Sequence, residues 1–156
     1  MTRPTADLDL VGLERAIDQA RRGRAEGGVP IGAALMTDDG AILGVGRNRR
    51  VQDGSAIRHG ETDALENAGR QQASVYARAT MYTTLSPCDM CSGAILLYGI
   101  PRVVIGENRT FVGAESLLRE RGVEVVNFDS TECAALMAAF IAEHPEIWNE
   151  DIGEVG

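Results

Sequence analysis

The chain is organised around Thr84-Leu85-Ser86-Pro87-Cys88-Asp89-Met90-Cys91, which joins the apolar run 79–85 to a second apolar run. The first run predicts a strand and the second a helix that begins near Cys88. Two cysteines three positions apart in the first turn of a helix lie on the same face. The partial positive charge of a helix N-terminus favours their thiolate forms. The pair therefore predicts a bound cation.

Two thiolates do not complete a zinc site, so the chain must supply a third ligand. It has only two histidines, His59 and His144. His144 is followed by Pro145 and is far in sequence from the cysteine pair, which indicates a surface residue. His59 lies in Arg58-His59-Gly60-Glu61, at another predicted helix start. A glutamate two positions after a ligand histidine, with Pro-Cys-x-x-Cys downstream, is the signature of zinc-dependent nucleobase deaminases.

Each motif also has a simpler interpretation. A single CxxC occurs in redox pairs and in half-sites of structural zinc, and an isolated histidine is more often structural than a ligand. The two motifs together, each at a predicted helix start, favour a catalytic zinc held by His59, Cys88 and Cys91. The third cysteine, Cys133, lies in an apolar helical pattern and is interpreted as core. Three cysteines do not form an even disulfide set, which indicates a reducing compartment.

Size and composition limit the partners of this protein. The 156 residues predict one domain, spanning 1–156, with one substantial core. A net charge of −8 and a pI near 4.7 disfavour a nucleic-acid partner. No apolar run has the length of a membrane span, and Met1 to Leu10 lacks the pattern of a signal peptide. We therefore expect a cytoplasmic protein with no membrane partner. The basic residues that cluster in sequence are interpreted as a solvated loop: Arg47, Arg49, Arg50 and Arg58.

The first half of the chain predicts a helix, a β-hairpin and a second helix. Apolar residues at helical spacing predict the first helix from Leu8 to Glu26, with Gly27-Gly28 after it. The predicted face of that helix consists of Leu10, Val11, Leu13, Ala16, Ile17 and Ala20. The runs 29–36 and 41–46, separated by Asp38-Asp39-Gly40, predict the hairpin. A polar loop is expected over 47–57 and a helix over 61–69.

In the second half, predicted strands alternate with predicted helices. The helix 88–98 is expected to turn Ala94, Ile95, Leu97 and Tyr98 toward the core. The other predicted elements are strands at 79–85, 103–105 and 123–128, helices at 116–121 and 132–143, and a turn or short helix at 145–152. Alternation of this kind indicates parallel pairing with helices on both faces of the sheet. The predicted fold is a three-layer α/β/α domain with a mixed five-stranded sheet, with its site where helices follow strands.

The expected ligand set defines the chemistry. Three protein ligands on zinc leave one coordination position for water, as in catalytic sites. The pKa of such a water falls from about 15.7 to about 7. Glu61 is then the expected proton carrier between this water and the substrate, and it does not itself bind zinc.

Several motifs across the chain resemble those of the fungal-type cytosine deaminases of the cytidine deaminase superfamily. The similarity spans nearly the whole sequence, including a tail outside the metal motif. The motifs are Glu26-Gly27-Gly28-Val29-Pro30-Ile31-Gly32, His59-Gly60-Glu61, Leu65-Glu66-Asn67, Tyr82-Thr83-Thr84-Leu85-Ser86-Pro87-Cys88-Asp89-Met90-Cys91, Tyr98-Gly99-Ile100-Pro101-Arg102 and Glu150-Asp151-Ile152-Gly153-Glu154.

The resemblance implies an activity and roles for particular residues. It implies deamination of free cytosine by a homodimeric zinc enzyme whose C-terminal segment acts as a lid. It also implies that Asn48 and the Gly60 backbone contact the pyrimidine, and that the Ser86 carbonyl accepts from its amino group. Asp151 would lie near that amino group. Two aromatic residues in polar surroundings, Phe111 and Trp148, would close over the base.

Some positions depart from the family pattern, and they leave the substrate open. Arg58 replaces an apolar residue before the histidine, Asp63 follows the Gly60-Glu61-Thr62 turn, and Arg109-Thr110 precede Phe111. Each is expected to alter the pocket rim. Isocytosine, a 5-substituted cytosine or another small aminated heterocycle are alternative substrates, because pockets discriminate small ring substituents by only about 1–3 kcal/mol.

Two further functions compete with this interpretation. One is deamination of a purine base or of adenosine in transfer RNA, which other branches of the superfamily perform. Those branches usually carry His-Ala-Glu where this chain has His59-Gly60-Glu61, and the acidic charge opposes RNA binding. The other is a non-catalytic, zinc-stabilised interaction domain, which would not need Glu61.

Overall fold

The computed structural model of the chain describes residues 6–155, so residues 1–5 and 156 of the expected domain lie outside the described part. Its centre is one sheet with the strand order β2-β1-β3-β4-β5. The strands are β1 (Gly32–Thr37), β2 (Ile42–Arg47), β3 (Ala79–Leu85), β4 (Arg102–Glu107) and β5 (Glu124–Asn127). β1 pairs antiparallel with both β2 and β3, whereas β3, β4 and β5 pair in parallel. The predicted mixed five-stranded sheet is confirmed over residues 6–155.

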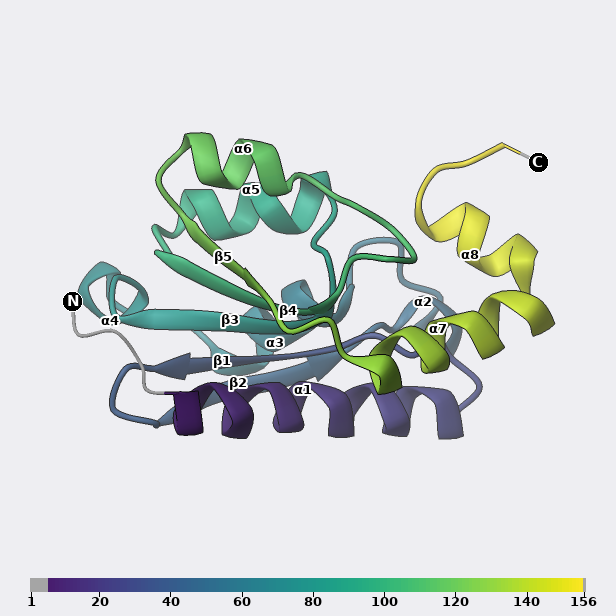
Figure 1. The fold of residues 1–156 in the computed structure, drawn as a ribbon, viewed down its shortest axis with the longest axis horizontal. Helices are drawn as coiled ribbons and strands as arrows, with labels where there is room; N and C mark the ends of the chain where they lie inside the picture. Colours follow the sequence, from purple (N-terminus) through teal and green to yellow (C-terminus); the bar gives the residue numbers. More distant parts are fainter. Residues whose placement is uncertain (1–5, 156) are drawn as a thin grey trace.

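Helices cover both faces of this sheet (Figure 1). The long α1 (Ala6–Ala25) and α7 (Thr131–Glu143) lie on one face, and α3 (Gly60–Ala68), α5 (Asp89–Leu97) and α6 (Glu115–Glu120) on the other. Because side chains alternate along a strand, Leu35 joins the core on the α3, α5 and α6 side, and Met36 joins the core on the α1 side. The three-layer α/β/α prediction is confirmed.

A third apolar cluster lies at the end of the sheet where β3 finishes. The short α8 (Pro145–Asp151) follows α7 (Figure 1). It carries Trp148, which belongs to this cluster. The other buried members are Val29, Ile31, Leu85, Met137 and Phe140. The predicted final short helix is therefore confirmed, and it packs where β3 gives way to the turn before α5.

Two short helices were not predicted. α2 (Arg50–Asp53) interrupts the expected loop 47–57, and α4 (Ala73–Tyr76) lies between α3 and β3. Each has four residues, which is about one turn and too short to show a helical period.

Two predicted core faces are partly wrong. Leu97 and Tyr98 are 74% and 44% exposed, whereas Ile95 is fully buried. Residues three and four apart share a helix face, so Ala94, Leu97 and Tyr98 lie together on a side that points away from the sheet. Similarly, Leu10 and Val11 on α1 are 56% and 47% exposed.

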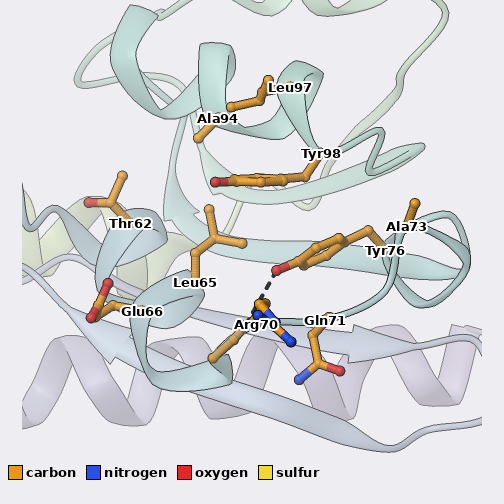
Figure 2. A pocket seen from close by; sticks show the side chains of 11 residues that line it. Thr62, Leu65, Glu66, Arg70, Gln71, Ala73, Tyr76, Ala94, Leu97 and Tyr98 are labelled. Atoms are coloured by element: carbon orange, nitrogen blue, oxygen red, sulfur yellow. Dashed lines mark hydrogen bonds between the residues drawn. The ribbon is translucent and has the colours of Figure 1, made fainter.

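The exposed side of α5 borders an open groove. Figure 2 shows the ring of Tyr98, the C-cap of α5, between Leu97 on one side and Leu65 of α3 and Tyr76 of α4 on the other. The groove has a volume of about 610 Å³. The rings of Tyr76 and Tyr98 are 5.1 Å apart, and the Tyr76 hydroxyl donates to the Gly69 carbonyl. This part of the surface thus combines apolar and aromatic side chains with polar ones.

Candidate active site

Two helix starts converge at the end of the sheet. His59 is the N-cap of α3 and Cys88 is the N-cap of α5, and both have extended backbone conformations. The backbone N–H of His59 donates to Thr62 Oγ1 over 2.8 Å, which is half of a capping box. Gly60 fits closely beside β1, because a Cβ there would lie 3.2 Å from the carbonyl carbon of Gly32. The close approach of α3 to β1 places His59 at the strand ends.

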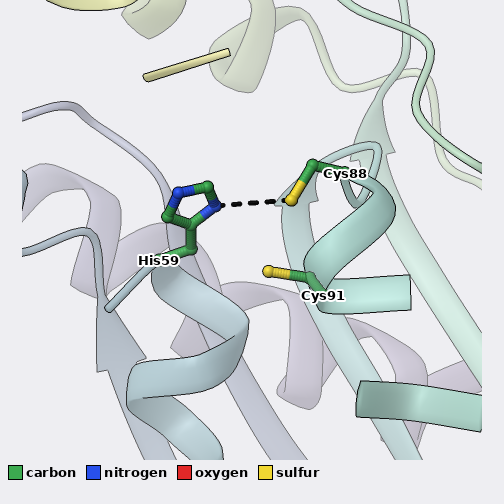
Figure 3. Close-up of side chains that lie close together, drawn as sticks. All are labelled: His59, Cys88 and Cys91. Atoms are coloured by element: carbon green, nitrogen blue, oxygen red, sulfur yellow. Dashed lines mark hydrogen bonds between the residues drawn. The ribbon is translucent and has the colours of Figure 1, made fainter. Parts of the chain in front are cut away.

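The residues predicted to bind metal come together here (Figure 3). One ligand atom each of His59, Cys88 and Cys91 lies within 4.8 Å of the others. Nδ1 of His59 is 3.5 Å from Sγ of Cys88. In a tetrahedral zinc site with the usual bond lengths, a nitrogen and a sulfur ligand are about 3.5 Å apart. The nitrogen and two sulfurs therefore fit zinc, with three protein ligands as in catalytic sites.

The electrostatics of the metal-free cluster favour one thiolate. Hydrogen bonds with Cys91 and, to a smaller extent, with His59 lower the pKa of Cys88 to about 4, despite burial. The hydrogen bond with Cys88, together with burial, raises the pKa of Cys91 well above its usual value. Burial alone would lower the pKa of His59, but Cys88, Asp151 and Glu61 raise it to about 9. Metal binding would displace these protons.

Glu61 lies in the first turn of α3, two residues after the histidine. Its side chain is buried, and the residue is only 4% exposed. Burial and the negative charge of Cys88 raise the pKa of Glu61 to about 7. A carboxyl group with a pKa near neutrality can both accept and donate a proton under ordinary conditions.

The outer side of His59 faces a carboxylate from the other end of the chain. Nε2 of His59 is 3.4 Å from Oδ1 of Asp151 on α8. The Asn48 side-chain amide donates to Oδ2 of Asp151 over 3.1 Å, and Arg50 Nε donates to Oδ1 over 2.7 Å. A carboxylate on the distal nitrogen orients a ligand histidine and selects its tautomer. Asp151 is placed to do this for His59.

A small, partly open space adjoins the metal ligands. Its volume is about 20 Å³, which accommodates about one water molecule. The rings of Phe111 and Trp148 meet edge to face, with centroids 6.0 Å apart. The lining consists of Ile31, His59, Glu61, Leu85, Ser86, Cys88, Phe111, Trp148, Asp151 and Ile152. A wider open pocket of about 470 Å³ adjoins this space and shares His59, Cys88, Phe111 and Asp151 with it.

Of the other predicted site residues, three lie outside this lining. Cys91 is fully buried beneath it, and Gly60 packs against β1. Asn48 is fully buried, with its side-chain oxygen accepting from the backbone N–H of Arg50. Its amide reaches Asp151, so it borders the space through that carboxylate.

Ser86 is held by contacts that the sequence analysis did not identify. Its hydroxyl donates to Oε2 of Glu115 over 2.6 Å and accepts from the backbone N–H of Gly113 over 2.9 Å. Its own backbone N–H donates to the Glu107 carbonyl. Glu115 is only 4% exposed, so these contacts tie the loop that carries Phe111 to the end of β3. No motif in the sequence indicated Glu115.

One predicted rim residue is misplaced. Asp63 is 1% exposed, and it accepts from the backbone N–H of Arg47 and from Arg58 Nε over 2.9 and 2.8 Å. The carboxylate is turned inward because it joins the end of β2 to the segment before His59. The expectation that Asp63 alters the pocket rim is therefore wrong.

The arginine cluster is also different from the expected solvated loop. The Arg47 and Arg50 side chains are only 19% and 16% exposed. Arg47 binds Glu26 through two nitrogens, and Arg50 binds the carboxylates of Glu150 and Asp151. Arg58 pairs with Asp63. Because these arginines are paired with carboxylates, they do not form a basic patch.

Within residues 6–155, none of the helices combines the length and apolar character needed to cross a membrane.

Comparisons with known proteins agree with this geometry. Residues 8–107 match the family model for the cytidine and deoxycytidylate deaminase zinc-binding region. A cytosine deaminase from Candida albicans is 58% identical over 94% of this chain and 97% of its own length. A tRNA-specific adenosine deaminase from Streptococcus pyogenes is 32% identical over 86% of this chain and 90% of its own length.

The fold is shared with solved structures. A structure from a study of tRNA:A34 deaminases has a TM-score of 0.67 and 25% identity, and covers 81% of this chain and 99% of that chain. A guanine deaminase structure from Nitrosomonas europaea has a TM-score of 0.72 at 20% identity, covering 91% of this chain and 87% of that chain. The second likeness concerns the fold alone.

Proposed function

The chain belongs to the cytidine and deoxycytidylate deaminase zinc-binding family, and on that premise we propose that it deaminates free cytosine hydrolytically to uracil and ammonia. The observation that carries this proposal is the convergence of three zinc-ligand atoms with Glu61 at an aromatic-walled space. The 58% identity to a cytosine deaminase over 94% of the chain supports the choice of base.

In this proposal His59, Cys88 and Cys91 hold zinc through the atoms that lie within 4.8 Å of one another. When bound, the metal supplies Lewis-acid activation of a water molecule. Asp151 keeps the His59 ring in place through its contact with Nε2.

Glu61 carries protons in the proposed reaction. Its buried carboxylate takes a proton from the attacking water and delivers it to the ring nitrogen next to the amino-bearing carbon. The carboxylate then takes the remaining proton of the added hydroxyl group and supplies it to the departing amino group, which leaves as ammonia while the carbonyl of uracil forms. Burial raises the pKa of this carboxyl, which favours proton transfer in both directions.

The remaining lining residues bind and enclose the base. We assign the two rings of Phe111 and Trp148 to contact with the faces and edges of the pyrimidine. The Ser86 carbonyl and Asp151 are assigned to the amino group, and Asn48 and the Gly60 backbone to the ring. Exclusion of bulk water by this wall strengthens the hydrogen bonds made inside it.

A free base is favoured over transfer RNA. The net charge is −8, and the arginines beside the site are paired with carboxylates. A polyanion would have to compete with those ion pairs. Isocytosine and 5-substituted cytosines remain alternative substrates within the same chemistry, since pockets discriminate small ring substituents by only about 1–3 kcal/mol.

We also propose a homodimer. Leu97 and Tyr98 are 74% and 44% exposed beside the groove of Figure 2, and a contiguous exposed apolar patch commonly marks an interaction surface. A second copy of the chain would cover these side chains.

The free cysteines of the described part are compatible with a cytoplasmic location, where the reaction would serve pyrimidine salvage.

Substrate profiling tests the function. Zinc-loaded protein is incubated with cytosine, isocytosine, 5-methylcytosine, cytidine, adenine, guanine and a transfer RNA, and ammonia is measured against the Glu61→Ala variant. Uracil and ammonia in equal amounts, with cytosine as the fastest substrate, are the expected result. Preference for a purine or for transfer RNA would contradict the assigned base, and zinc binding without any turnover would favour the non-catalytic interpretation.

A further inference from the structure

Arg50 joins two parts of the site that are far apart in sequence. It stands at the first position of α2, and its partners lie on α8. Its Nε donates to Oδ1 of Asp151 and its Nη1 to Oε1 of Glu150, each over 2.7 Å. The side chain is only 16% exposed. One guanidinium therefore bridges two consecutive carboxylates of the helix that walls the site.

The Asp151 half of this bridge is buried. The Asp151 side chain is 2% exposed, and a buried carboxylate is stable only with charged or hydrogen-bonding partners. Arg50 is the cationic partner within 2.7 Å, and Asn48 adds one amide hydrogen bond. The oxygen that Arg50 binds is also the one 3.4 Å from Nε2 of His59. The position of Arg50 thus determines where this carboxylate oxygen meets the histidine.

The Glu150 half is solvent-facing. The Glu150 side chain is 66% exposed, and exposed ion pairs contribute little to stability. The two contacts of Arg50 are consequently unequal, and single substitutions can separate them.

The same helix carries the aromatic wall. Trp148 is 6% exposed, on α8 between α7 and Asp151, and its ring meets that of Phe111. The space of about 20 Å³ beside the metal ligands opens next to a wider pocket of about 470 Å³, whose lining includes Arg50, Phe111 and Asp151. α8 and the Phe111 loop therefore border the way to the metal ligands. The ion pairs of Arg50 oppose movement of α8.

We propose that Arg50 is a positioning residue that holds α8 against the site and aims Asp151 at His59 and at the amino group of the base. It touches no reacting atom itself. The part that concerns the base rests on the proposed function, whereas the part that concerns α8 does not.

Arg50→Gln separates positioning from mere stability. Without the bridge, α8 lies against the site in only a fraction of the molecules. The apparent affinity for the base is reduced by that fraction. We expect the KM for cytosine to rise about tenfold with kcat changed less than about threefold. A residue that only stabilises the fold would lower the active fraction and so kcat, with KM unchanged, and that result would overturn the proposal.

Two matched variants serve as controls. Arg49→Gln makes the same change one residue earlier, where the guanidinium faces Glu26, Asp53 and Asp63 and not α8. Glu150→Gln removes only the exposed half of the bridge. Both are expected to keep KM within about twofold of the parent value, because the ion pairs that they remove are partly exposed and such pairs contribute little. Arg50→Lys keeps the charge without the planar fork and should fall between the parent and Arg50→Gln; a KM for Arg50→Lys above that of Arg50→Gln would count against the bridge.

Fluorescence provides a readout that needs no turnover. Trp148 is the single tryptophan of the chain, so intrinsic fluorescence reports directly on α8. In the zinc-loaded protein without substrate, acrylamide should quench Trp148 more strongly in Arg50→Gln than in the parent or Arg49→Gln. Equal quenching in all three would overturn the proposal. A parent enzyme inactive on every base would refute the proposed function, while the quenching comparison would still decide the role of Arg50.

Discussion

Nδ1 of His59 lies 3.5 Å from Sγ of Cys88, although the two residues begin different helices. α3 and α5 follow different strands. The contact forms because both helices start at the same end of the sheet. This N–S separation matches that of two ligands on one tetrahedral zinc.

The zinc assignment predicts the effect of removing one sulfur. Cys91→Ala should lose bound zinc as well as activity, because two ligands do not hold the metal. Cys133→Ala removes a sulfur from the α1 side of the core and should keep one equivalent of zinc. Zinc per chain, measured by atomic emission after dialysis, checks both. Parent-like zinc in Cys91→Ala would show that the ligand set is wrong.

The proton-carrier role of Glu61 predicts a different result. Glu61→Gln should keep zinc and the fold, because Glu61 is not among the proposed ligands, but kcat should fall by about 10² to 10⁴. Steady-state uracil formation and zinc content, measured on one preparation, give the comparison. A Glu61→Gln protein as active as the parent would remove Glu61 from the mechanism.

Asn48 is predicted to act in binding. Asn48→Ala deletes a buried amide that reaches Asp151 and an oxygen that accepts from Arg50. We expect kcat/KM on cytosine to fall by about tenfold or more, which is the order of a lost buried hydrogen bond. Unchanged kinetics on every accepted base would refute this role.

The proposed dimer predicts a change of mass. Leu97→Glu places a charge on the exposed side of α5 and should shift the protein from dimer to monomer in sedimentation velocity. Leu10→Glu is the matched control, because Leu10 is 56% exposed on α1, across the sheet from α5. If both variants and the parent sediment alike, this face of α5 is not the interface.

Glu26 predicts a pH dependence of stability. Its hydrogen bonds with Arg47 and Gln52 lower its pKa to about 2. A carboxyl whose folded pKa lies below its unfolded value stabilises the fold above the unfolded pKa, and this contribution is lost as the pH falls toward the folded pKa. The urea midpoint of Glu26→Gln should therefore lie below that of the parent at pH 7, with the difference shrinking below about pH 4.5. A difference independent of pH between 7 and 3 would exclude this linkage.

Local patterns in the sequence determined much of this protein. The apolar runs and glycine turns predicted the strands, and the spacing of His59, Glu61, Cys88 and Cys91 predicted a zinc site, because both signals lie within a few neighbouring residues. Such signals do not depend on distant parts of the chain. These local signals predicted all five strands of the sheet.

Only the tertiary structure decided which distant side chains meet and which helix faces are covered. Arg50 meets Asp151 across 101 positions, and Asp63 turns inward to Arg47 and Arg58. An arginine in a polar stretch has the same local pattern whether it is solvated or paired. Likewise, the apolar Leu97 lies exposed because the direction of α5 over the sheet leaves that face uncovered. These outcomes depend on how helices pack, which no short stretch of sequence encodes.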